Sequence, residues 1–228
     1  MDGIYSTEQI ALILKIVKIL IYFYFQALFL RRASRKWAES EPVNLEICTF
    51  AFFFCMMLGS LSEIIWIETN PTFYALIGAS YNYFIGFIAL TFLSLGIERS
   101  ARLKTKGLIA IIPFGMAIFT LIIGNLITAP PYYFVALIVA VIPLLFIYQG
   151  FKSEGLIRRQ FLYIGVGYFL VFAGEAFNYF IVETNFSWIL DAWNMTGISF
   201  HIIPPFLIIL GLLCLLNGYV RLPRKIAL

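Results

Sequence analysis

Long apolar stretches alternate with short polar connections along the whole chain. An α-helix rises about 1.5 Å per residue, so about 20 apolar residues cross a bilayer core of about 30 Å. Seven stretches approach or reach this length, and none alternates like a β-barrel strand. They lie near residues 10–30, 45–67, 73–96, 108–127, 132–148, 161–182 and 197–220. The pattern predicts an all-α, polytopic bundle of seven transmembrane helices that forms a single domain over residues 1–228.

Prolines mark two of these stretches. Pro130, Pro131 and Pro143 are expected to bound or interrupt the fifth, and Pro204-Pro205 is expected to kink the seventh and serve as a hinge.

Basic residues predict how the bundle is oriented. All Lys and Arg residues except Lys15 and Lys18 follow the first, third, fifth and seventh stretches. Cytoplasmic loops carry the excess of Lys and Arg in membrane proteins. We therefore expect the N-terminus outside, the C-terminus in the cytoplasm, and the plasma membrane as the location.

Composition excludes the soluble alternatives. The chain is 62% hydrophobic and 12% charged, with a mean hydropathy of +0.93, whereas a soluble domain has about 25% charged residues. With 3 cysteines, a disulfide-rich secreted scaffold is also excluded. The net charge of +4 fits the orientation of the helices and attraction to anionic lipid headgroups. The bilayer is thus the expected partner, and nucleic acid is not.

A weak internal similarity suggests duplication. Residues 58–70 align without a gap on residues 173–185, which matches Gly59 with Gly174 and superposes two Glu-Thr-Asn tripeptides. The scheme would be two parallel three-helix repeats joined by the fourth helix, as in some transporters. The alternative is that glycine and helix-ending residues recur in membrane spans by chance.

Charged residues inside the apolar stretches are the candidate site. Such a residue costs at least about 2.5–3.5 kcal/mol near a helix centre, so it needs a partner and is a functional candidate. Helical spacing places Lys15, Lys18, Tyr22 and Gln26 on one stripe of the first helix. The polar residues expected in the outer half of the bundle are Lys15, Lys18, Glu63, Asn82, Glu175, Asn178 and His201.

Two interpretations of this set remain open. It can line one pocket, open to the outside, that binds a small ligand or an ion. Alternatively, the lysines extend toward the surface along their aliphatic stems, and the carboxylates only hold helices together.

The residue inventory argues against an enzyme. One histidine cannot supply an intramembrane zinc site or paired haem ligands, and no Gly-rich phosphate loop is present. Both aspartates lie outside the apolar stretches, which excludes an intramembrane aspartyl pair. We expect no cofactor, no metal and no catalytic residues, although acid–base work by Glu63 and Glu175 stays open.

One tripeptide resembles a receptor signature. Glu98-Arg99-Ser100 is similar to the Glu-Arg-Tyr of rhodopsin-like receptors, but the Trp-x-Pro and Asn-Pro-x-x-Tyr motifs of that family are absent. The seventh stretch also lacks the lysine of a retinal protein. No family is assigned on these grounds.

Three functions fit the pattern. The first is a sensor or receptor-like module that responds to an outside ligand or to protons and signals through a separate partner protein. The second is a transporter of a small solute, coupled to protons or cations. The third is a non-catalytic scaffold subunit of a membrane complex.

Overall fold

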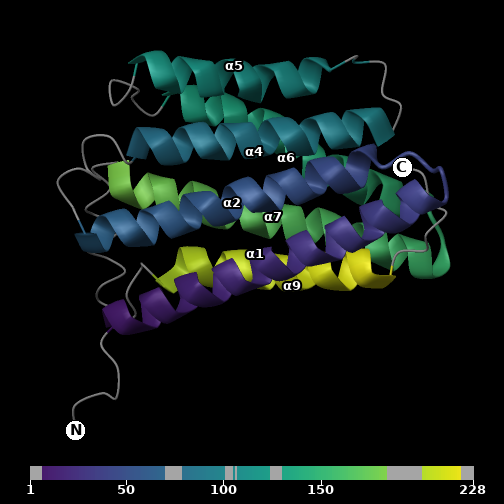
Figure 1. Cartoon of the computed structure of the whole chain (residues 1–228), viewed down its shortest axis with the longest axis horizontal. Coiled ribbons are helices and arrows are strands. Elements are labelled where there is room, and N and C mark those ends of the chain that lie inside the picture. Colours follow the sequence, from purple (N-terminus) through teal and green to yellow (C-terminus); the bar gives the residue numbers. More distant parts are fainter. Residues whose placement is uncertain are drawn as a thin grey trace, which may run out of the picture. The chain divides into compact units, whose positions relative to one another are not determined.

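The computed structural model describes residues 7–69, 79–100, 105, 107–123, 130–183 and 202–221. Within these ranges it is all-helical and contains seven helices (Figure 1). They are α1 (Thr7–Ala38), α2 (Asn44–Thr69), α4 (Ala79–Ser100), α5 (Leu108–Ile123), α6 (Pro130–Lys152), α7 (Gly155–Glu183) and α9 (Ile203–Arg221). Each helix overlaps one predicted apolar stretch, so the expected helical class is confirmed.

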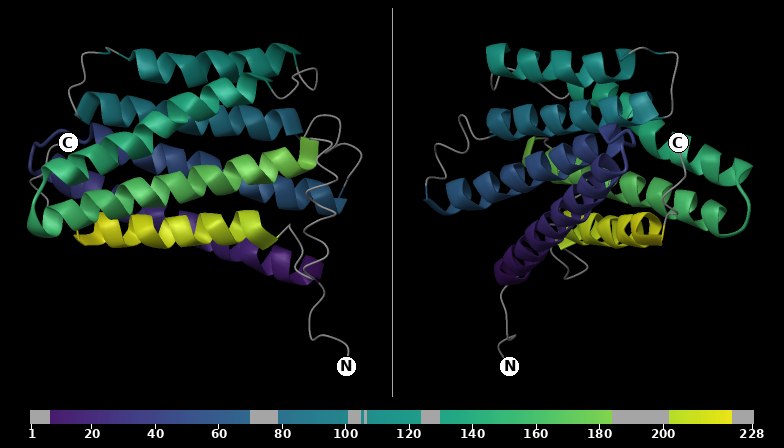
Figure 2. Two further views of the ribbon diagram at one scale, coloured as in Figure 1. Left: turned by 180° about the vertical axis from the view of Figure 1, so that it is seen from behind. Right: turned by 45° about the vertical axis from the view of Figure 1, so that its right-hand side comes forward.

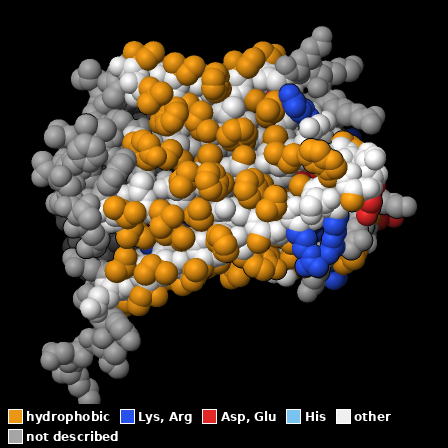
Figure 3. All heavy atoms as spheres, in the orientation of Figure 1, with side chains coloured by type: hydrophobic (Ala, Val, Ile, Leu, Met, Phe, Trp, Pro, Cys, Tyr) orange, Lys and Arg blue, Asp and Glu red, His pale blue; other side chains and the backbone are white. Residues whose placement is uncertain are grey.

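Five of the helices are long and apolar enough to cross a membrane. They are α1, α2, α4, α7 and α9. The described side chains of α5 and α6 form shorter apolar segments, Leu108–Ile122 and Ala140–Lys152. Large apolar side chains are exposed on the helices, among them Ile122 at 77% and Leu20 at 63%, and Figure 3 shows them spread over the face that it displays. Such a surface suits lipid rather than water, so the chain is an integral membrane protein.

The prolines follow the sequence-based expectation in part. Pro130 and Pro131 bound the start of α6, as expected, whereas Pro143 does not interrupt the helix, which continues to Lys152. Helix α9 is described from Ile203, with Pro204 and Pro205 in its first turn; residues 184–201 lie outside the described part of the chain, so the expected kink stays a prediction. The first turn has no intrahelical acceptor for an N–H, and a proline there costs nothing.

Helix α1 ends in a well-defined cap. Ser40 has a positive φ of 55°. The Glu41 amide donates to the Lys36 carbonyl at 2.8 Å, and the Ser40 amide donates to the Trp37 carbonyl at 3.0 Å. This bonding pattern satisfies carbonyl groups that the end of a helix leaves without partners.

Contacts divide the chain into two compact units. The first consists of Met1–Ile21 with Tyr132–Arg224, and the second of Tyr22–Pro131 with Lys225–Leu228. Helix α1 is continuous and contributes residues to both units.

The first unit is built around the pair α7 and α9, which lie side by side (Figures 1 and 2). A Cβ built on Gly211 would lie 2.7 Å from the Gly167 carbonyl oxygen, so no larger residue fits without moving the backbone. Deep in this pair, the Tyr168 and Tyr219 hydroxyls form a 2.8 Å hydrogen bond. Small residues allow such close helix contact in membranes.

The second unit packs α2 against α4 and α4 against α5. An aromatic cluster fills the contact between α1 and α2, where the rings of Phe25 and Phe53 stack with centroids 4.4 Å apart. Tyr22 and Phe29 also face Phe53, at 6.0 Å each.

Candidate functional site

The polar stripe predicted on α1 lies on the buried side of the helix. Lys18 is 3% exposed, Tyr22 is fully buried and Gln26 is 7% exposed, whereas Lys15 is partly exposed. The Gln26 side-chain amide contacts the Phe53 carbonyl at 3.5 Å and the Met57 sulfur at 3.2 Å. Lys18 therefore does not extend its ammonium group to the surface.

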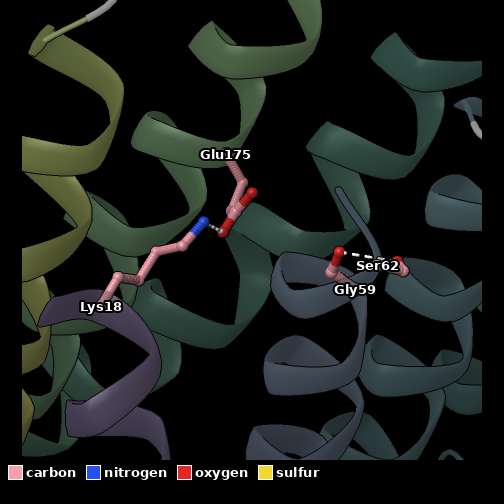
Figure 4. Close-up of polar contacts among 4 residues, drawn as sticks. All are labelled: Lys18, Gly59, Ser62 and Glu175. Atoms are coloured by element: carbon pink, nitrogen blue, oxygen red, sulfur yellow. Dashed lines mark hydrogen bonds and ion pairs between the residues drawn. The ribbon is translucent and has the colours of Figure 1, made fainter. Parts of the chain in front are cut away.

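Lys18 forms an ion pair with Glu175 inside the first unit. The Lys18 Nζ and Glu175 Oε1 atoms are 3.6 Å apart, and the side chains are 3% and 15% exposed. Figure 4 shows the lysine reaching from α1 toward the carboxylate on α7. The distance is too long for a strong hydrogen bond, so charge attraction holds the two groups.

The position of Glu175 is fixed by its neighbour in the chain. A Cβ built on Gly174 would lie 2.9 Å from the Pro204 carbonyl oxygen of α9. Helix α7 is thus held tightly against α9 at the residue before the carboxylate.

A buried ion pair adds little net stability, because the penalty for removing its charges from water offsets their attraction. Removing two charges from water carries a penalty of several kcal/mol per ion, and the mutual attraction often fails to repay it. Ionisable groups in membrane spans are rare and mark sites of ligand, proton or ion chemistry. The Lys18–Glu175 pair is therefore the strongest candidate site in the described part of the chain.

A second polar cluster lies between α2 and α4 in the second unit. The Ser62 hydroxyl lies 2.9 Å from the Gly59 carbonyl oxygen and 2.9 Å from Asn82 Oδ1; Figure 4 shows the contact with Gly59. Its single proton serves one acceptor at a time. Glu63 is 8% exposed and Asn82 is 6% exposed. These residues all belong to the second unit.

The remaining candidates stay as predictions. His201 and the side chain of Asn178 lie outside the described residues. The single pocket predicted for all seven residues is thus neither confirmed nor contradicted. Within the described ranges, no three His, Cys, Asp or Glu side chains are grouped closely enough to hold a metal ion.

Sequence reasoning missed two buried carboxylates at helix ends. Glu98, on α4, accepts hydrogen bonds from the Thr105 hydroxyl at 2.6 Å and from the Ile109 amide at 3.0 Å. Glu46, in the first turn of α2, pairs with Lys36 Nζ at 2.8 Å. Acidic residues are favoured near helix N-termini, which was the available clue for Glu46. Glu98 lies near the C-terminal end of α4, so this preference gave no clue to it.

Comparison with models of known protein families, with curated proteins and with solved structures gave no match for this chain. Its function must therefore be argued from the chemistry of its own residues.

Proposed function

We propose that this chain is an integral membrane sensor or receptor-like module. In this proposal a small ligand or a proton arriving from outside acts on the Lys18–Glu175 pair. The pair then loosens, α7 moves relative to α1, and a separate partner protein receives the change. The observation that carries the proposal is the buried ion pair itself.

Three features of the pair support this role. It joins two helices far apart in the sequence, so breaking it changes a tertiary contact. The 15% exposure of Glu175 gives a competing cation or proton access to the carboxylate. The close contact of Gly174 with α9 gives the movement a route to a second helix.

The proposal includes an orientation. All seven helices cross the bilayer, with the N-terminus outside and the C-terminus in the cytoplasm, and the membrane is the plasma membrane. The last turns of α1, α4 and α6 carry basic residues, Arg35 and Lys36, Arg99, and Lys152. These positions agree with the proposed orientation, because cytoplasmic loops of membrane proteins carry an excess of Lys and Arg. The pair then lies in the outer half of the bundle.

A distance measurement tests whether the pair controls the helices. Spin labels are placed at exposed positions of α1 and α7, Ile13→Cys and Phe169→Cys, after replacement of the three native cysteines. In lipid nanodiscs, Glu175→Gln is expected to shift or broaden the α1–α7 distance distribution measured by electron resonance. Glu39→Gln, which removes an exposed carboxylate, is the matched control and should leave the distribution unchanged. An identical distribution in Glu175→Gln would overturn the proposal.

A flux measurement separates the sensor from the transporter. The purified protein is reconstituted in liposomes that contain a pH-sensitive dye, and a proton gradient is imposed. The sensor proposal predicts no proton flux above that of empty liposomes. Flux that Glu175→Gln abolishes would replace the sensor with a proton-coupled carrier.

A further inference from the structure

The turn between α6 and α7 carries an exposed group of basic and aromatic side chains. We propose that this α6–α7 turn, residues 148–159, binds the phosphate-bearing headgroup of an anionic membrane lipid. The inference is independent of the sensor proposal, because it uses none of the residues of the Lys18–Glu175 pair.

The charge of the turn is strongly positive. Lys152, Arg158 and Arg159 are all exposed, and Glu154 is the one acidic residue in the segment. None of the three cations forms an ion pair within the described ranges. Lys36, in contrast, is neutralised by Glu46 at the end of α1. The turn is therefore a site of uncompensated positive charge.

Aromatic rings hold two of the cations in place. Lys152 Nζ lies 4.5 Å from the centre of the Tyr148 ring, and Arg158 Cζ lies 6.0 Å from the centre of the Phe151 ring. The two rings are themselves exposed, Tyr148 at 53% and Phe151 at 65%. Tyrosine is enriched where a membrane meets water, and cations above such rings sit at the depth of the headgroups.

The backbone adds a third contribution. Helix α7 begins at Gly155, which has a positive φ of 60°. A Cβ built on Gly155 would meet nothing within 4 Å, so the space beside the helix start is open. The free N–H groups and the dipole at a helix N-terminus attract phosphate. Arginine adds planar, paired donors that match phosphate oxygens.

The occupant is a lipid rather than a soluble phosphate because exposed apolar side chains accompany the basic ones in the turn. Phe151 and Leu156, which is 57% exposed, offer contacts to acyl chains beside the cations. A soluble phosphate would gain nothing from these side chains. An anionic phospholipid satisfies the charge and covers the apolar surface together.

Native mass spectrometry of the full chain tests the proposal. The protein is equilibrated in mixed micelles with equal amounts of phosphatidylglycerol and phosphatidylcholine. Each basic residue near an anionic surface contributes about fivefold in affinity. The Lys152→Gln, Arg158→Gln, Arg159→Gln variant should therefore lose the preference for retained phosphatidylglycerol by about tenfold or more.

Matched variants make the result specific. Arg31→Gln, Arg35→Gln, Arg99→Gln removes the same charge from exposed residues at other helix ends and should keep the preference within about twofold of wild type. Arg158→Lys with Arg159→Lys keeps the charge but loses the paired arginine donors, so it should retain more of the lipid preference than the triple glutamine variant. A large excess of inorganic phosphate should not displace it.

Four results would overturn the proposal. They are no lipid preference in the wild type, equal loss in both charge-removing variants, a loss in the lysine variant as large as in the triple glutamine variant, or displacement by phosphate alone. The last would identify a site for soluble phosphate instead.

Discussion

A buried carboxylate holds the start of α5. Glu98 is 4% exposed, and its Oε1 atom accepts hydrogen bonds from both Thr105 and Ile109. The amide groups in the first turn of a helix have no intrahelical acceptor. Glu98 supplies one from the preceding helix, so the end of α4 and the beginning of α5 are fixed to each other.

Loss of this acceptor should loosen the first turn of α5. We expect Glu98→Ala to cost about 1 kcal/mol locally, as a lost helix cap does, and to speed exchange of the Ile109 amide by roughly fivefold. Glu98→Gln keeps an acceptor oxygen and should have a smaller effect. Hydrogen exchange followed by mass spectrometry measures both variants. Equal exchange in wild type and Glu98→Ala would show that the contact does not hold the helix.

At the residue scale, helical spacing predicted part of the candidate site. The steps between Lys18, Tyr22 and Gln26 identified the buried side of α1. The partner of Lys18 could not be predicted, because Glu63 and Glu175 were both expected at a similar depth. The choice of Glu175 depends on which helices touch, and one sequence does not contain that information.

At the element scale, α7 and α9 form the closest contact in the first unit. Gly167 and Gly174 on α7 are seven residues apart, as are Gly211 and Gly218 on α9. A seven-residue repeat keeps one side of a helix against its neighbour over several turns. The backbones therefore approach closely along the length of the pair rather than at one point.

Adding one methyl group should disrupt this contact. In Gly211→Ala the new Cβ would lie 2.7 Å from the Gly167 oxygen and 2.8 Å from the Val171 nitrogen, both backbone atoms that cannot turn aside. We expect overpacking to lower the stability by about 1–3 kcal/mol, seen as a lower unfolding temperature in detergent.

Gly115→Ala on α5 is the matched control. A Cβ there would meet nothing within 4 Å, and alanine is the better helix former. The unfolding temperature should stay the same or rise. A Gly211→Ala protein as stable as Gly115→Ala would contradict the close α7–α9 contact.

The sequence predicted the helices better than their packing and their ends. Apolar length alone located each helix in the described part of the chain, because a backbone in lipid must satisfy its own hydrogen bonds. Among the prolines, Pro130 and Pro131 bound α6 as expected, but Pro143 lies within the continuous helix, because a proline inside a membrane helix is tolerated where local adjustments satisfy the freed carbonyl group. The glycine spacing was visible in the sequence. Several helices carry glycine, however, so the spacing does not identify which helix packs against α7.

At the scale of the whole molecule, the expected duplication is not confirmed. Gly59 and Gly174 are matched in the alignment, yet they have different surroundings. A Cβ on Gly59 would make an ordinary 3.6 Å contact with Ile85, whereas one on Gly174 would press against the α9 backbone. The part of the alignment from Asn70 and from Thr184 onward lies outside the described residues.

Whether α5 and α6 cross the membrane decides between seven spans and five. If α5 and α6 both cross, the segment between them lies outside the cell; if neither crosses, it lies in the cytoplasm. We expect Asn125→Cys, in a chain without native cysteines, to react with a membrane-impermeant maleimide on intact cells. Glu41→Cys, between α1 and α2, should react only after permeabilisation. Protection of Asn125→Cys until permeabilisation would contradict seven spans.

The most direct test of the central claim is a double-mutant cycle on the Lys18–Glu175 pair, using the free energy of unfolding in mixed micelles. Lys18→Met and Glu175→Gln each leave one buried charge without its partner, a loss of about 3–5 kcal/mol for a fully buried pair. The 15% exposure of Glu175 places the expected loss toward the lower end. Arg35→Met, on an exposed arginine, is the control and should change stability by less than about 0.5 kcal/mol.

The account predicts that the double variant is more stable than the sum of the single losses implies, by at least about 1 kcal/mol. Losses that add to within about 0.5 kcal/mol would mean that the two charges do not interact, and the proposed site would have no basis.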